Sequence, residues 1–197
     1  MGWGASAGGR LMAEVTRSSW DQAVRSIFCE LSFAAVGARK NDDWRRDVIS
    51  IMELKSKDPR GWLSINHAPG PSSHLECSPE RPFLSRVVDD FDWVFDVSRR
   101  SAEQILVTLQ GEWFTTSGID DFDARKDSLL DDASVILGRF GESARYLTNM
   151  SAARDDPHAD MFRHEGSYEG FTDYTVDCGV IAVSDTEVGV FWGFIID

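Results

Sequence analysis

The sequence CGVIAVSDTEVGVFWGFII, residues 178–196, is the part of the chain that decides the fold. Two runs rich in β-branched and aromatic residues flank the polar tetrapeptide SDTE, which is typical of a compact connection between antiparallel strands. Apolar residues fill both alternating sets of positions in the second run, as in a central strand covered on both faces. The preceding residues 166–177 also have a strand-like pattern, so we predict an antiparallel meander here.

Helical periodicity dominates the first third of the chain. Ser19 and Gln22 have the spacing of a capping box, and apolar residues follow at helical spacing as far as Gly37. A second helix is expected to begin at Asn41 or the next residue and to end in the segment DPRG, residues 58–61. We expect these two helices to pack as a pair.

The middle of the chain alternates between short strand patterns and helical patterns. In FDWVFDV, residues 91–97, aromatic and apolar residues alternate with a mostly acidic set, which indicates a strand with one buried face. The remaining expected elements are helices from Ser98 or Ser101 to Gly111 and from Asp123 to Gly141, and strands at 62–66, 112–117 and 144–150.

These patterns predict an α+β fold, with an N-terminal helical pair followed by a mostly antiparallel sheet on which two further helices pack. A chain of 197 residues, 42% of them hydrophobic, is long enough to bury one ample core. We therefore expect a single α+β domain over residues 12–197, preceded by a disordered tail at residues 1–11, which are rich in glycine and small residues.

The net charge and its distribution indicate which kinds of molecule the protein can bind. The net charge is −13, and the acidic excess lies late in the chain: residues 61–150 carry eight basic and fifteen acidic side chains, and residues 151–197 carry two and ten. Such a field repels phosphate backbones and anionic lipids and speeds encounter with basic partners. We therefore expect a basic protein partner and no direct binding of nucleic acid, although acidity also serves solubility alone.

Three cysteines, Cys29, Cys77 and Cys178, lie far apart in the sequence and form no CxxC pair. An odd number at such spacing suggests neither a disulfide framework nor a zinc site, so a reducing compartment, the cytoplasm, is expected. The longest apolar run, residues 188–196, is about half of what a membrane-spanning helix requires. We expect no membrane association.

The most chemistry-rich segment is DDPHADMFRHE, residues 155–165, with four carboxylates and two of the four histidines. Asp156 before a proline predicts the start of a short helix, on which His158 would point away from the other candidate ligands. Only Asp160 and His164, spaced i and i+4, would share a face, and a metal site would need further ligands from elsewhere. The alternative is an ordinary surface pair on a solvated helix.

A second candidate is the tetrapeptide DDFD, which occurs twice, in VVDDFDW and in GIDDFDA. Neither copy has the calcium-loop pattern with its glycine and distal glutamate. We therefore interpret the first copy as carboxylates at the edge of a strand and the second as a helix cap, neither of which requires a metal ion. Carboxylates beside aromatic residues also suit an arginine-rich partner. The predicted partner-binding residues are Asp89, Asp90, Asp92, Trp93, Asp120 and Asp121.

The chain contains no GxSxG, P-loop, GxGxxG after a strand, HExxH or CxxC motif. We therefore favour a non-catalytic acidic binding protein that sequesters a basic protein partner, with a toxin-neutralising immunity protein of the bacterial cytoplasm as the specific version. No cofactor is expected, and the sequence leaves the oligomeric state open. The alternative is a small metal-dependent hydrolase that uses Asp160 and His164 with carboxylates from elsewhere in the fold.

Overall fold

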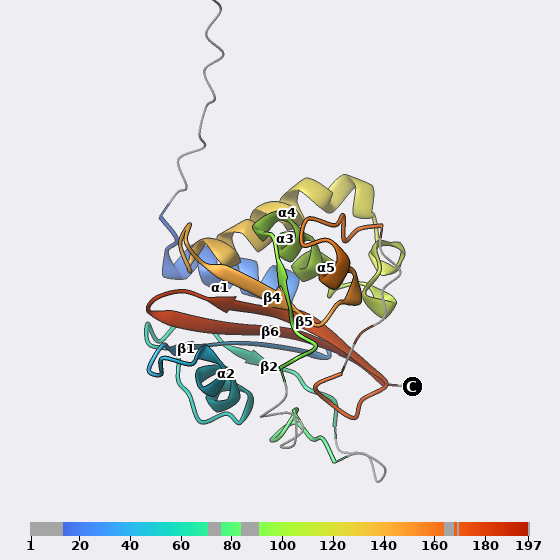
Figure 1. Cartoon of the computed structure of the whole chain (residues 1–197). Helices are drawn as coiled ribbons and strands as arrows, with labels where there is room; N and C mark the ends of the chain where they lie inside the picture. Colours follow the sequence, from blue (N-terminus) through green and yellow to red (C-terminus); the bar gives the residue numbers. More distant parts are fainter. Residues whose placement is uncertain (1–13, 71–75, 84–90, 164–167, 169, 197) are drawn as a thin grey trace, which may run out of the picture.

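A hairpin of two long strands, β5 (Val176–Val183) and β6 (Glu187–Ile195), lies at the centre of the protein (Figure 1). The computed structural model describes residues 14–70, 76–83, 91–163, 168 and 170–196. The turn of the hairpin is the predicted SDTE segment, in which Ser184 N donates to Glu187 O at 2.9 Å. The hairpin and its central position confirm the prediction from the C-terminal sequence.

The hairpin belongs to a six-stranded sheet with the order β2-β1-β6-β5-β4-β3. Every neighbouring pair is antiparallel. All seven residues of β1 pair with β6, which makes β6 a central strand. The other strands are β1 (Ser32–Ala38), β2 (Ile65–Asn66), β3 (Phe95–Val97) and β4 (Arg145–Thr148).

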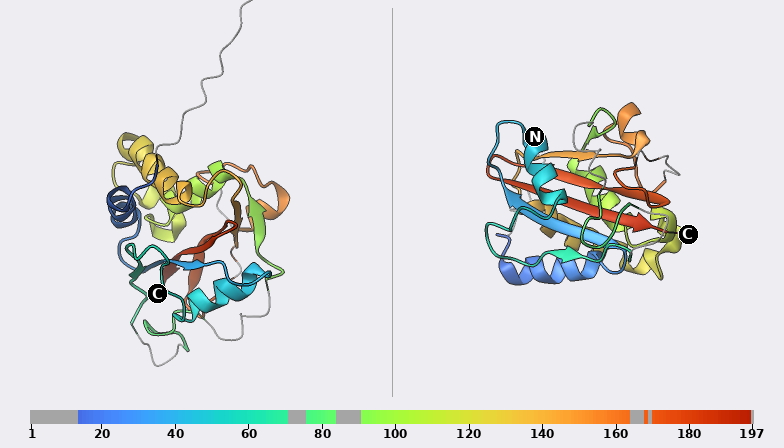
Figure 2. Two further views of the ribbon diagram at one scale, coloured as in Figure 1. Left: turned by 90° about the vertical axis from the view of Figure 1, so that its left-hand side faces the viewer. Right: turned by 90° about the horizontal axis from the view of Figure 1, so that it is seen from below.

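Helices cover both faces of this sheet, so the predicted α+β class is confirmed (Figures 1 and 2). One face, here called the upper face, carries α1 (Arg17–Ile27), α3 (Arg99–Thr108), α4 (Phe122–Gly138) and the short α5 (Ser151–Asp155). The lower face carries α2 (Trp44–Met52). Two 3-10 turns, η2 (Glu112–Phe114) and η3 (Thr116–Gly118), join α3 to α4.

The alternation of side chains along each strand separates two apolar cores. On β6, Phe191 faces the upper core, where it stacks on Phe28, while Trp192 faces the lower core, where it contacts Phe171. Residues 187–194 of β6 are all buried, which is why this strand is apolar on both faces. No helix among the described residues is long and apolar enough to cross a membrane.

The N-terminal helices differ in detail from the prediction. The expected helix through Gly37 ends at Ile27, and the following apolar residues form β1 instead. Its capping box lies three residues earlier, because Thr16 Oγ1 accepts from Ser19 N and Thr16 N donates back to Ser19 Oγ. With β1 between them, α1 and α2 lie on opposite faces of the sheet rather than side by side.

Three other local predictions are wrong. Residues 112–117, expected as a strand, form the two 3-10 turns, in which Trp113 and Phe114 have left-handed backbone angles. The helix expected after Asp156 is absent from residues 157–163, where turns follow the end of α5. The strand expected at 166–177 begins only at Val176, within β5, and its other described residues form bends and one isolated bridge at Tyr168.

Candidate functional site

The connection between α3 and α4, together with the first turn of α4, carries an exposed tryptophan and several exposed carboxylates. Trp113 is 45% exposed, whereas the other five tryptophans of the described chain are buried or half-buried. Glu112, Asp120, Asp121 and Asp123 are exposed as well. We call these five residues the Trp113 surface.

Close backbone packing shapes this connection. A Cβ atom at Gly118 would lie 2.2 Å from the backbone nitrogen of Glu112, so η3 packs directly on η2 and only glycine fits at position 118. Phe114 turns inward, is 3% exposed and packs edge-on against Tyr168 with ring centroids 5.7 Å apart. Phe114 thus anchors the connection in the upper core, while its neighbour Trp113 remains at the surface.

The backbone of the Trp113 surface is strained. Trp113, Phe114 and Asp121 have φ angles of 56°, 53° and 52°, in the left-handed region that bulky residues rarely adopt. Burial in the core accounts for the conformation of Phe114. It does not account for Trp113, which is 45% exposed. Backbone strain of this kind gathers at binding sites, where the surrounding structure holds a side chain in a set position.

A shallow hollow lies between η3 and the first turn of α4. Its volume is about 530 Å³, and its lining includes the carboxylates of Asp121 and Asp123 and the apolar side chains of Ile119 and Phe122. Carboxylates around a partly apolar hollow match the guanidinium and aliphatic stem of an arginine side chain. The hollow therefore extends the Trp113 surface with a place for a basic side chain.

The structure separates the two DDFD copies. Asp120 and Asp121 belong to the Trp113 surface on the upper side of the sheet. Asp92 is exposed, but Trp93 is half-buried against the lower core, with its ring centroid 4.3 Å from that of Phe171. The remaining predicted partner-binding residues, Asp89 and Asp90, lie outside the described residues.

Asp160, the first residue of the alternative metal pair, has protein partners. Its carboxylate accepts from Gln104 Nε2 at 2.9 Å and from Phe162 N at 3.3 Å, and it lies 3.3 Å from Arg163 Nε. Within the described residues, no group of three or more histidine, cysteine, aspartate or glutamate side chains could hold a metal ion. His164 lies outside the described residues, so the Asp160–His164 prediction remains untested.

Buried ionisable groups elsewhere are held by structural contacts. Burial raises the pKa of Asp177, while donors from Phe171, Thr172 and Trp192 act in the opposite direction. Burial also raises the pKa of Cys77 to about 12, which keeps that thiol protonated and unreactive. Neither Asp177 nor Cys77 lines the pockets described above and below, which are formed by residues that the structure describes.

The sequence predicts Asp120 and Asp121 as partner-binding residues but places Trp113 in a strand, although Gly111 and Gly118 bracket that segment and indicate a tight connection. Local sequence does not indicate that Arg100 and Lys126 line one pocket, because they belong to separate segments of the chain. Neither a known protein family, nor a curated protein, nor a solved structure matches this chain.

Proposed function

We propose that the protein is a non-catalytic acidic binding protein that sequesters a basic protein partner through the Trp113 surface. The observation that carries this proposal is an exposed tryptophan in a left-handed backbone conformation, on a connection that also carries four exposed carboxylates. Tryptophan is among the residues that contribute most to binding energy at protein interfaces. The carboxylates supply the complementary charge.

The overall charge supports the same proposal. A net charge of −13 attracts a basic protein from a distance and raises its association rate at low salt. Contact is then made by Trp113, which loses its remaining water-exposed area, and by Asp120 and Asp121, which pair with basic side chains. The carboxylates mainly set rate and orientation, while the indole ring supplies most of the affinity.

The specific version is a toxin-neutralising immunity protein of the bacterial cytoplasm. A basic toxin that acts on nucleic acid needs a positively charged active site, and an acidic inhibitor blocks such a site by charge and shape. The three free cysteines, of which Cys29 is exposed, support a reducing compartment.

The experiment tests the proteins encoded by the neighbouring genes for one that is basic and binds this protein. Binding is measured by surface plasmon resonance at low and moderate salt, and growth rescue is scored when both proteins are co-expressed. We expect Trp113→Ala to weaken binding by about 2 kcal/mol, roughly 30-fold in Kd, and to abolish rescue. Asp120→Asn with Asp121→Asn should lower the association rate and its salt dependence.

The charge-matched control is Asp42→Asn with Asp185→Asn, since both residues are exposed and lie outside the Trp113 surface. Asparagine tolerates left-handed backbone angles, so the change at Asp121 should leave the fold intact. This function would be ruled out if binding did not depend on salt concentration, or if Trp113→Ala bound the partner as strongly as the unaltered protein.

A further inference from the structure

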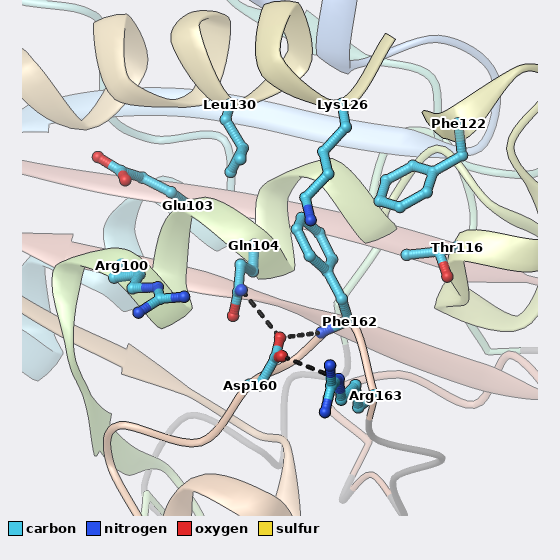
Figure 3. Close-up of a pocket in the computed structure, with 10 residues that line it drawn as sticks. All are labelled: Arg100, Glu103, Gln104, Thr116, Phe122, Lys126, Leu130, Asp160, Phe162 and Arg163. Carbon is cyan, nitrogen blue, oxygen red and sulfur yellow. Dashed lines mark hydrogen bonds and ion pairs between the residues drawn. The ribbon is translucent and has the colours of Figure 1, made fainter. Parts of the chain in front are cut away.

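A second hollow lies behind the Trp113 surface, between α3, α4 and the loop at residues 156–163 (Figure 3). Its volume is about 280 Å³, which suits a small ligand. Arg100, Lys126 and Arg163 line it together with two carboxylates and two phenyl rings. A pocket with three cations is unexpected in a protein with a net charge of −13.

The walls of this pocket are fixed by a buried glutamine. Gln104 of α3 is 4% exposed; its Nε2 donates to Asp160 Oδ1 at 2.9 Å, and its Oε1 accepts from Met161 N at 2.9 Å. These two bonds hold the loop against α3. Figure 3 shows the hydrogen bond between Gln104 and Asp160, both of which line the pocket. The pocket is thus built by contacts that do not depend on a ligand.

The side chains that line the pocket carry more positive than negative charge. Glu103 Oε1 accepts from Arg99 Nε at 3.0 Å, and Asp160 pairs with Arg163, so both carboxylates of the lining already have a cationic partner. Within the described part of the chain, neither Arg100 nor Lys126 has a carboxylate within 4.0 Å. Two positive charges are therefore left to attract an anion.

The apolar part of the pocket lies next to these charges. Phe122 and Phe162 pack edge-on with ring centroids 5.2 Å apart, and the ammonium group of Lys126 lies 5.2 Å from the centre of the Phe162 ring. Figure 3 shows Lys126 reaching from α4 towards the Phe162 ring, with Phe122 beside it. A ligand bound here would meet Arg100 on one side and, on the other, the Lys126 ammonium group beside the phenyl rings.

We infer that this pocket binds a small organic anion, in which a carboxylate or phosphate group is joined to an aromatic or apolar body. The anionic group would bind Arg100 and Lys126, and the body would pack on Phe122 and Phe162. The pocket shares Thr116 and Phe122 with the hollow that extends the Trp113 surface. Its proposed ligand is nevertheless a small molecule, so small-molecule probes test this inference without any protein partner.

The experiment measures binding of phenyl phosphate and of 3-phenylpropionate by ligand-observed NMR and calorimetry. Inorganic phosphate measures the binding of an anionic group alone, and benzyl alcohol measures the binding of an aromatic ring alone. We expect saturable binding of at least one aromatic anion, at least tenfold tighter than either inorganic phosphate or benzyl alcohol. The tighter of the two aromatic anions identifies the anionic group that the pocket prefers.

The decisive variant is Arg100→Gln with Lys126→Gln, which should weaken binding of the preferred aromatic anion at least tenfold. Arg46→Gln with Lys57→Gln is the matched control, because it makes the same two chemical changes at exposed positions outside the pocket and should change binding less than twofold. Arg100→Lys should retain binding. Absence of saturable binding, equal binding of benzyl alcohol, or binding unchanged by Arg100→Gln with Lys126→Gln would overturn the inference.

Discussion

Arg139 and Glu187 bind each other through two hydrogen bonds although their side chains are only 0% and 5% exposed. Arg139 also donates two bonds to Asp58, and its guanidinium lies over the rings of Trp20 and Trp62. The end of α4, the start of β6, α1 and the segment before β2 are thereby joined at one buried point. Because these elements are far apart in sequence, this cluster stabilises the tertiary fold rather than any one element.

Removing one partner of this buried pair should be strongly destabilising. Glu187→Ala leaves the Arg139 charge partly uncompensated in the interior, and we expect a loss of about 3–5 kcal/mol in the free energy of unfolding. Asp96→Ala is the control, because it breaks the Asp96–Arg145 pair, whose side chains are 55% and 51% exposed, and an exposed pair contributes about 0–1 kcal/mol. Urea denaturation measures both, and similar losses would contradict a special role for burial.

Replacing the carboxylate of Asp177 with an amide should destabilise the protein. Its Oδ1 accepts from Phe171 N and Trp192 Nε1, and its Oδ2 accepts from the backbone nitrogen and the hydroxyl of Thr172. Asp177→Asn places an NH₂ group against donors, and a buried unsatisfied donor costs about 1–3 kcal/mol. Chemical denaturation followed by tryptophan fluorescence checks this, with the exposed Asp185→Asn expected to change stability by less than about 0.5 kcal/mol.

Gly179 should be required by the central hairpin. A Cβ atom there would lie 2.1 Å from the carbonyl oxygen of Phe191 and 2.3 Å from the ring of Trp192. Gly179→Ala must therefore push β5 away from its partner or displace the indole, at a cost of about 1–3 kcal/mol or more. At Gly70 an added Cβ meets nothing within 4 Å, so Gly70→Ala should be nearly neutral in the same thermal unfolding assay.

The three thiols should differ in reactivity. Cys29 is exposed, whereas Cys77 and Cys178 are buried, and burial raises the pKa of both buried thiols. The thiolate is the reactive form, so at pH 8 a thiol reagent should label one cysteine rapidly and the other two only after unfolding. Cys29→Ser should remove the rapid phase. Rapid labelling of more than one thiol in the native protein would contradict the buried environment of the other two.

The local pattern of apolar residues predicted much of the sheet but assigned the residues of the first strand to a helix. Residues 32–38 fit a helical continuation from α1, since a short apolar run is compatible with either structure. Pairing of all seven residues with β6 decided in favour of β1. In the same way, Gln104 and the bond from Ser98 N to Pro157 O hold residues 157–161 against α3, where local sequence indicated a helix.

The candidate sites also differ in whether local sequence or long-range contacts determine them. Asp120 and Asp121 are predicted as partner-binding residues from the sequence, because clustered carboxylates are visible there. The exposure of Trp113, and the lack of a carboxylate partner for Arg100 and Lys126 among the described residues, depend on which distant residues fold beside them.

The sequence by itself determined the α+β class, the central hairpin and the acidic character, because periodicity, turn residues and charge act over short stretches of chain. Only the tertiary structure decided the order of the strands, the buried Arg139 cluster and the environment of Trp113. Those features depend on contacts between residues far apart in the chain, and their energies arise only when the packed elements exclude water together.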